Sequence, residues 1–421
     1  MVKMKTFKLG ELLSVKHGFP FKGEFFKNSG KYIVLTPANF YEEGGFKETP
    51  GKEKYYSGLF PKEYICKKGD LIVVMTQQAE GLLGSTAFVP VGGKYLHNQR
   101  IGLITTNREK LLPDFANYLF RTNNVRKQIR DSASGSKVKH TSPEKIYNVV
   151  VDIPDISLQE RISALLNALD DKIALNKRIN DKLEAMAKRL YDYWFVQFDF
   201  PDENGHPYKS SGGKMVWNET LKREIPEGWK VKRIDEIANI FNGSTPATDN
   251  QQYYGGDIVW ITPKDLSDQN SKFVYKGARN ITVEGYNSCS TTIIPKGSIV
   301  MSSRAPIGLL SIAQCDLCTN QGFKNLVPKH AMDSYYLYYT LKSNIGKIQN
   351  LGTGTTFKEV SKDDLGRFSL LYPSNDITSL FTNKLTSLFA KQLLIEKQSA
   401  RLMSLRDRLL PLLMNGQVEV K

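Results

Sequence analysis

Two long stretches of the sequence place apolar residues at every seventh position. The first stretch occupies residues 157–194 and the second residues 379–416. A seven-residue apolar repeat is typical of helices that pack side by side as a left-handed coiled coil. Ser157 and Glu160 have the spacing of a capping box, and Pro154 discourages an earlier helix start. At about 1.5 Å per residue, each helix would span roughly 57 Å.

The same spacing predicts which side chains face the partner helix. Asn176 is a polar exception, of a kind that can fix the register of a coiled coil at some cost in stability. The predicted seam residues are Ile162, Leu165, Leu169, Asn176, Ile179, Leu183 and Leu190 in the first helix, and Phe381, Leu388, Ile395, Leu402 and Leu409 in the second. A companion seam is expected at Leu158, Leu165, Lys172, Ile179, Met186 and Tyr193.

The two stretches correspond to each other at a constant offset of 219 positions, from Ile162 and Phe381 to Leu190 and Leu409. The correspondence continues upstream, where "SGSKVKHTSPEKIYNVVVDIP" at 134 aligns with "TGTTFKEVSKDDLGRFSLLYP" at 353. Further matches join "KKGDLIVVMT" at 67 with "PKGSIVMSSR" at 295, and "HNQR" at 97 with "TNQG" at 319. The chain is therefore predicted to be an internal duplication of a globular domain followed by a long helix.

Each globular half combines short apolar runs, bounded by Gly, Pro and Asn, with short amphipathic stretches. This pattern predicts a mixed α/β domain with short strands and short helices. A segment rich in Gly, Pro, Ser and charge separates the halves and reads as a linker. The predicted segments are a first domain at 1–155, a central helix at 156–198, a linker at 199–221, a second domain at 222–374 and a C-terminal helix at 375–416.

The charge of the chain points to a polyanionic partner. Its formal net charge is +15 and its pI is near 9.3, values typical of nucleic-acid-binding proteins but also of basic proteins that bind nothing specific. No stretch is long and apolar enough to suggest a membrane span or a signal peptide, so a cytoplasmic protein is expected. Cys315 and Cys318 form one C-x-x-C without a second pair, which favours ordinary thiols and no metal site.

Familiar catalytic motifs do not occur in the sequence. It contains no phosphate-binding G-x-x-x-x-G-K-[ST] loop, no H-E-x-x-H and no Pro-Pro dipeptide of the kind found in base-flipping amino-methyltransferases. We therefore expect a chain that performs no chemistry by itself. An enzyme with a degenerate active site is the alternative that a cofactor-binding assay would expose.

Three segments resemble one family, the DNA-specificity subunits of type I restriction–modification enzymes. They are "DIPDISLQERISALLNALDDKIALNKRINDKLEAMAKRLYDYWFVQFD" in the centre, "IPEGWKVKRIDEIANIFNGSTP" at the start of the second half and "GTGTTFKEVSKDDL" before the second helix. The start of the second helix, "LLYPSNDITSLFT", departs from the family pattern because it lacks the Gln-Glu pair.

The resemblance implies two target recognition domains, each reading one half of a split DNA sequence. It also implies that the two long helices pair antiparallel, with pseudo-twofold symmetry, and hold the domains at a set distance on duplex DNA. The implied partners are two methyltransferase subunits and two ATP-driven restriction subunits. S-adenosylmethionine, ATP and Mg would bind those partners, and none of them this chain.

Candidate DNA-binding residues come from loops that recur in both halves but differ in content. Polar side chains can read base edges, whereas Lys and Arg grip phosphates. The alternative is that these loops are ordinary solvated turns, and Asn98, Gln99 and their counterparts could equally be structural. The basic helix "NNVRKQIR" at 123–130 is expected to be a solvated face. The candidates are Lys16, His17, Asn39, Gln77, Gln78, Asn98, Gln99, Arg100, Ser134, Ser136, Lys137, Lys139 and His140 in the first half, and Asn242, Ser244, Lys264, Ser302, Ser303, Arg304, Asn320, Gln321, Thr353, Thr355, Thr356 and Lys358 in the second.

The sequence also permits a protein-interaction adaptor, in which the helices and domains bind only protein and the charge serves solubility. A steep dependence of DNA binding on salt would favour the DNA reader over this alternative.

Overall fold

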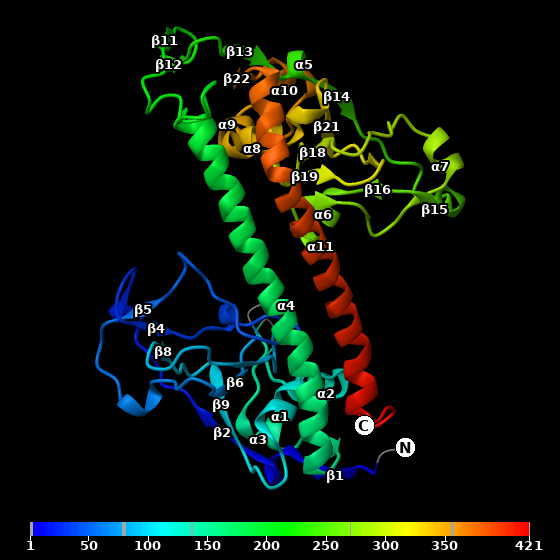
Figure 1. Ribbon diagram of the computed structural model, residues 1–421. Coiled ribbons are helices and arrows are strands. Elements are labelled where there is room, and N and C mark those ends of the chain that lie inside the picture. Colours follow the sequence, from blue (N-terminus) through cyan, green and yellow to red (C-terminus); the bar gives the residue numbers. More distant parts are fainter. Residues whose placement is uncertain (1–2, 78–80, 136–137, 270, 355–357, 421) are drawn as a thin grey trace. The chain divides into compact units, whose positions relative to one another are not determined.

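The computed structural model describes residues 3–77, 81–135, 138–269, 271–354 and 358–420 (Figure 1). The chain forms two compact units. Unit 1 comprises Met1–Leu175 with Ser399–Lys421, and unit 2 comprises Asn176–Gln398. Two long helices, α4 (Ile156–Tyr191) and α11 (Asn375–Met414), each contribute one part to unit 1 and the other part to unit 2.

Unit 1 is built on a four-stranded antiparallel sheet in the order β2-β9-β6-β7. A second sheet has the order β3-β5-β4-β8, in which β4 and β8 are parallel, and β1 pairs with β10. The strands are β1 (Lys5–Lys8), β2 (Leu13–His17), β3 (Phe26–Lys27), β4 (Tyr32–Val34), β5 (Tyr55–Tyr56), β6 (Leu71–Val74), β7 (Thr86–Phe88), β8 (Tyr95–Leu96), β9 (Ile101–Thr106) and β10 (Val150–Ile153). The short helices are α1 (Pro113–Leu119), α2 (Asn123–Ser132) and α3 (Pro143–Tyr147).

The start of α4 is anchored in the core of unit 1. Leu158, Ile162 and Leu166 are buried in the same apolar cluster as Leu413 and Met414 from the end of α11. Gln159 is fully buried, and its side-chain amide donates to the carbonyls of Lys110 and Pro154, both at 2.9 Å. Because a buried amide needs all its partners, this glutamine fixes where the helix leaves the domain.

The helix start differs from the predicted capping box. The Asp155 carboxylate accepts the backbone N–H of Leu158 at 2.9 Å, and α4 already includes Ile156 and Ser157. The prediction that Ser157 and Glu160 cap the helix is therefore wrong. Aspartate is an equally good N-cap residue, and Asp155 follows Pro154 directly, so the helix begins earlier than expected.

Unit 2 has a five-stranded sheet in the order β14-β21-β18-β19-β17, antiparallel except for the β17–β19 pair. Smaller pairs are β16-β20, β13-β22 and the hairpin β11-β12. The strands are β11 (Met215–Asn218), β12 (Arg223–Pro226), β13 (Lys230–Arg233), β14 (Ala238–Asn242), β15 (Tyr254–Ile258), β16 (Trp260–Ile261), β17 (Phe273–Val274), β18 (Ile299–Ser302), β19 (Leu310–Ala313), β20 (Cys318–Thr319), β21 (Phe323–Pro328) and β22 (Ser369–Tyr372). The short helices are α5 (Ile234–Ile237), α6 (Pro263–Gln269), α7 (Val283–Asn287), α8 (Ser334–Ser343), α9 (Ile345–Gln349) and α10 (Lys362–Arg367).

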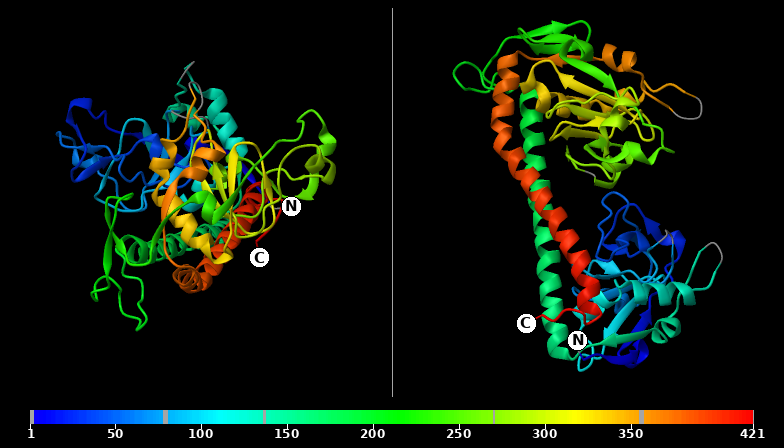
Figure 2. Two further views of the ribbon diagram at one scale, coloured as in Figure 1. Left: turned by 90° about the horizontal axis from the view of Figure 1, so that it is seen from above. Right: turned by 90° about the vertical axis from the view of Figure 1, so that its right-hand side faces the viewer.

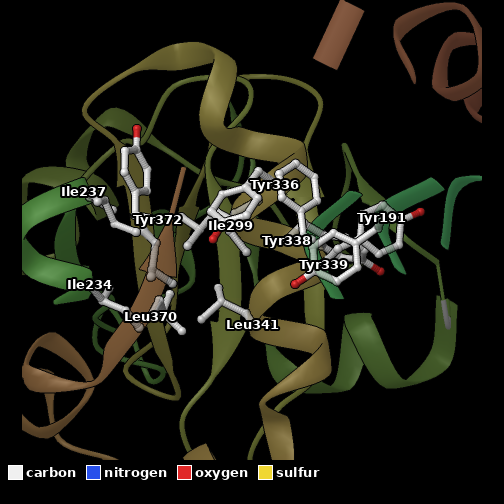
Figure 3. Packing of buried hydrophobic residues seen from close by; sticks show 14 of the residues in the cluster. Tyr191, Ile234, Ile237, Ile299, Tyr336, Tyr338, Tyr339, Leu341, Leu370 and Tyr372 are labelled. Carbon is white, nitrogen blue, oxygen red and sulfur yellow. The ribbon is translucent and has the colours of Figure 1, made fainter. Parts of the chain in front are cut away.

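Tyrosines of α8 pack against the end of α4 in the core of unit 2 (Figure 3). Tyr339 stacks on Tyr191 with ring centroids 5.5 Å apart. The Tyr191 hydroxyl lies 3.1 Å from the Thr340 hydroxyl, so its polar end is satisfied inside the core. The expected linker also joins this core, because the Phe200 ring stacks on the rings of Tyr208 and Trp229.

Within each unit the two long helices run antiparallel. In unit 2, the Asn176 side chain donates to Gln398 at 3.1 Å and the Asn180 side chain donates to Glu396 at 2.9 Å. In unit 1, Arg406 donates to Asp170 at 2.8 Å. The C-terminal end of α11 lies beside the beginning of α4 in the same unit (Figure 2).

The predicted companion seam holds at Leu158, which is buried, but further along α4 the buried row is displaced by one residue from its predicted position. Lys172, Met186 and Tyr193 are exposed, whereas Leu166 and Ala187 are buried. The second buried row therefore lies four residues after the main seam rather than three, and α11 buries Leu385, Gln392 and Leu413 in the same way. Both spacings bring side chains to one face of a helix, so the heptad pattern alone leaves the choice open. In the part of the chain that the structure describes, no helix is long and apolar enough to cross a bilayer.

Candidate nucleic-acid interface

One edge of the main sheet in unit 1 gathers polar residues from three strands. His17 ends β2 opposite Gly102 of β9, and Val74 ends β6 opposite Ile101. The turn 98–100 before β9 therefore lies beside the residues that follow β2 and β6. A Cβ on Gly18 would lie 2.1 Å from the carbonyl oxygen of Asn98, so only glycine permits this close approach.

The loop 134–140 joins the same edge through its backbone. Ser134 and His140 exchange N–H to carbonyl hydrogen bonds of 2.9 and 2.8 Å. The N–H of Gln77 donates to the carbonyl of Lys139 at 2.9 Å, and the Thr76 hydroxyl lies 3.1 Å from Nδ1 of His140. Ser134, Lys139 and His140 of the loop are thus held against the end of β6 by hydrogen bonds, without an ion pair among the described residues.

Unit 2 brings the corresponding segments together at one edge of its main sheet. Asn242 ends β14 opposite Lys324, and Ser302 ends β18 opposite Phe323. The N–H of Ser303 donates to the carbonyl of Gly322 at 2.8 Å, and the N–H of Val360 donates to Ser303 at 3.0 Å. These bonds connect the turn 320–322 and the loop 353–359 to the end of β18.

Charged side chains hold the loop of unit 2. Lys324, whose side chain is 9% exposed, donates to the Glu359 carboxylate at 3.0 Å, and the Ser303 hydroxyl donates to the same oxygen at 3.3 Å. The second carboxylate oxygen lies 3.8 Å from the Arg304 guanidinium. Partial burial opposes ionisation of Glu359, but the hydrogen bond and charge of Lys324, together with Arg304, keep its pKa below the ordinary value.

The candidate residues divide by exposure. Exposed side chains can meet DNA directly, whereas buried ones act within the fold. Lys16, His17, Gln99, Arg100, Ser134, His140, Asn242, Lys264, Gln321, Thr353 and Lys358 are exposed; Gln77, Asn98, Lys139, Ser244, Arg304 and Asn320 are half-buried; Asn39, Ser302 and Ser303 are buried; Gln78, Ser136, Lys137, Thr355 and Thr356 lie outside the described residues.

The buried candidates make their side-chain hydrogen bonds inside the fold, which argues against direct contact with DNA. The Asn39 side chain accepts the N–H of Thr36 at 2.9 Å and donates to the carbonyl of Lys47 at 3.4 Å. The Ser302 hydroxyl donates to Pro306 at 2.6 Å and accepts the N–H of Leu309 at 2.8 Å. Ser303 is equally buried and donates to Glu359. Asn39 and Ser302 close turns, Ser303 bonds to a neighbouring loop, and all three side chains are buried away from the surface.

The paired asparagines have a structural role in both units. The Asn98 side chain accepts the N–H of Arg100 at 3.1 Å, and the Asn320 side chain accepts the N–H of Gly322 at 2.9 Å. Such asparagine turns are common in loops. The structure thus favours the turn role over base reading for these two residues. Gln321 also has a partner inside unit 2, since its carbonyl accepts the hydroxyl of Thr245.

Other candidates lie away from these edges or are already paired. Lys16 forms an ion pair of 3.1 Å with Glu63 and lies over the ring of Tyr64. Lys264 lies on α6, next to the Thr262–Asp265 cap rather than at the end of a strand of the main sheet. Lys16 and Lys264 are therefore not counted with the residues at the two sheet edges.

Sequence reasoning missed three charged residues. Arg126, expected on a solvated face, instead donates to the carbonyls of Phe120 and Glu42, both at 2.7 Å, and burial lowers its pKa to about 10. The other two are Lys324 and Glu359. A lysine within the apolar run "FKNLV" was the signal that a buried partner must exist. Among the described residues, no group of three or more His, Cys, Asp and Glu is placed to hold a metal ion.

Comparison with known proteins gives a consistent set of matches. A family model described as "Type I restriction modification DNA specificity domain" matches residues 1–185 and 226–402. The chain is 27% identical to the HindI specificity subunit of Haemophilus influenzae, over 99% of this chain and all of that one. It is 43% identical to the MjaIX specificity subunit of Methanocaldococcus jannaschii over 167 residues, which are 38% of this chain and 39% of that relative. The solved S subunit from M. genitalium has a similar fold, with a TM-score of 0.64 and 14% identity over 98% of this chain and 96% of that one.

Proposed function

The chain belongs to the family of type I restriction–modification DNA specificity subunits, and on that premise we propose that it reads a bipartite DNA target, one half-site with each of two domains. The observation that carries the proposal is the recurrence of one arrangement in both units. In each unit a loop, a turn and two strand ends meet at one edge of the main sheet. Apart from Val138, the candidate side chains exposed there are polar or basic, as direct readout and phosphate contacts require.

In this proposal the reading domains are residues 1–155 and 222–374, related by internal duplication. The long helices act as a spacer, paired as an antiparallel coiled coil. The contacts of Asn176 with Gln398 and of Asp170 with Arg406 support such pairing. A helix of roughly 57 Å could separate two readers by one to two turns of duplex DNA, at about 34 Å per turn.

The proposal assigns the chemistry to partner subunits. Two methyltransferase subunits would carry S-adenosylmethionine, and two restriction subunits would carry ATP and Mg. This chain would contribute sequence recognition and a docking frame, without catalysis of its own. It would act in the cytoplasm, where the host DNA is.

Selection of bound duplexes from a randomised pool tests the proposal, using the full chain with and without a methyltransferase subunit. The expected result is two short motifs separated by a fixed, unspecified gap. A folded chain that enriches no sequence under either condition would favour the coiled-coil protein adaptor instead.

The spacer role has its own test. Inserting seven residues into α4 and the matching seven into α11 should lengthen the gap between the two selected motifs without changing either motif. A gap that stays the same would contradict the spacer role.

A further inference from the structure

The two sheet edges differ in one respect that bears on which base each unit reads. At the end of β14, unit 2 has Lys324 opposite Asn242, where unit 1 has Gly102 opposite His17. The loop residue beside this position is Glu359 in unit 2 and His140 in unit 1. Unit 2 therefore contains a row of charges, Lys324, Glu359 and Arg304, that unit 1 lacks.

The geometry of this row fixes the carboxylate of Glu359. One oxygen accepts Lys324 at 3.0 Å and Ser303 at 3.3 Å, so the carboxylate cannot rotate freely. Lys324 is buried on β21, between β14 and β18 in the five-stranded sheet, so its ammonium group is held in place beneath the carboxylate. The other oxygen then faces the Arg304 guanidinium at 3.8 Å, an ion pair without a direct hydrogen bond.

The contact with Glu359 is an ion pair and does not use the N–H donors of Arg304 in a hydrogen bond. Its side chain is 37% exposed, and among the described residues the structure gives it no partner other than Glu359. A guanidinium that lies next to a fixed carboxylate and keeps its N–H donors can donate two parallel hydrogen bonds to a guanine edge. A lysine at the same place would supply charge without this fork.

Resting on the proposed function, we infer that Arg304 reads a guanine in the half-site of unit 2 and that Glu359, anchored by Lys324, is the residue that positions it. Arg304 supplies the two donors to O6 and N7 of the base. Glu359 contacts no base and acts only through Arg304. The same position in unit 1 is uncharged, so its half-site carries no corresponding guanine requirement from this position.

The test is duplex selection with the full chain and its R304A, R304K, E359Q and E359D variants. R304A and R304K should both lose a guanine preference of about ten- to hundredfold at one position of one half-site, with the other half-site unchanged. R304K separates base reading from charge, and its retention of the wild-type motif would overturn the inference. E359Q should relax the same position, and E359D should restore part of the preference.

E359Q could also destabilise the fold, because it leaves the buried ammonium of Lys324 without a carboxylate partner. The double variant K324M–E359Q removes both charges and so leaves no unpaired buried charge. It is used in the selection experiment in place of E359Q if thermal unfolding shows that E359Q is destabilised. Relaxation at the Arg304 position in the double variant supports the positioning role, whereas a wild-type motif in that variant overturns it. A wild-type chain that enriches no motif overturns the proposed function, whereas a wild-type motif that R304A leaves intact overturns only this inference.

Discussion

The sheet edges of unit 1 and unit 2 hold equivalent loops by different chemistry. In unit 1 the ends of the loop 134–140 are fastened by backbone hydrogen bonds and by a contact between the Thr76 hydroxyl and His140. In unit 2 Thr353 and Glu359 exchange the same kind of backbone hydrogen bonds, at 3.1 and 2.9 Å, and the buried ammonium of Lys324 adds a charged contact to the carboxylate of Glu359. One backbone arrangement can therefore present two different polar surfaces, because a few side chains at the strand ends change while the ladder beneath them stays the same.

Replacing the loop anchor should have the largest effect and should differ between the units. Glu359→Ala leaves Lys324 as a buried, unpaired charge, and we expect a loss of about 2–4 kcal/mol in the free energy of unfolding. His140→Ala removes one partly buried hydrogen bond and leaves no buried charge, so it should cost about 1 kcal/mol or less. Urea unfolding of both variants measures the contrast. Equal losses would contradict the difference in anchoring.

Acid should weaken unit 1 before unit 2. His97 is buried, its Nε2 lies 2.8 Å from the Ile101 carbonyl oxygen, and burial lowers its pKa. A histidine with a lowered folded pKa resists protonation, so the unfolded chain binds the extra proton once pH falls below about 6.5. Stability is then lost at up to about 1.4 kcal/mol per pH unit. Unit 2 has Thr319 at the equivalent sequence position.

The measurement is thermal unfolding between pH 7.5 and 5.5, followed by a probe in unit 1. His97→Gln should remove most of the pH dependence in this window. If the His97→Gln variant keeps the full pH dependence of stability, groups other than His97 cause that dependence. The lowered pKa of Glu359 contributes outside this window, because that stability is lost only as pH falls below the ordinary glutamate value of about 4.3 and through the folded pKa.

The loop lysines should contribute equally in both units. Lys139→Ala and Lys358→Ala should each weaken DNA binding by about 1 kcal/mol and reduce the slope of log affinity against log salt by about one. The selected motifs should stay unchanged, because phosphate contacts carry no base information. A motif altered by either variant would assign base reading to that lysine.

The smallest effects are expected at the turn asparagines. Asn98→Ala and Asn320→Ala should each lower stability by about 0.5–1 kcal/mol through loss of one turn hydrogen bond. Neither should alter the selected motif. If a variant changes the selected half-site while its stability is unchanged, that asparagine contacts a base and the turn role is contradicted.

The sequence by itself determined the two long helices, the mixed α/β character and the family. These features depend on local periodicity and on motifs whose residues are close together in the chain. All four loop and strand-end segments that form each edge were also identified from their recurrence, including the match of "FKLGELLSVKHG" at 7 with "VKRIDEIANIFNG" at 231. The heptad pattern predicted the main seam, and none of its residues is exposed.

Only the tertiary structure decided which of these residues face outward. Asn39 and Ser302 are of residue types that can read base edges, yet their hydrogen bonds close turns inside the fold. Lys324 and Glu359 are 35 positions apart and meet only because a strand end and a loop share one sheet edge. Burial and long-range pairing depend on the register of strands that no local pattern specifies, which is why exposure, anchoring and charge at the two edges could not be predicted from the sequence.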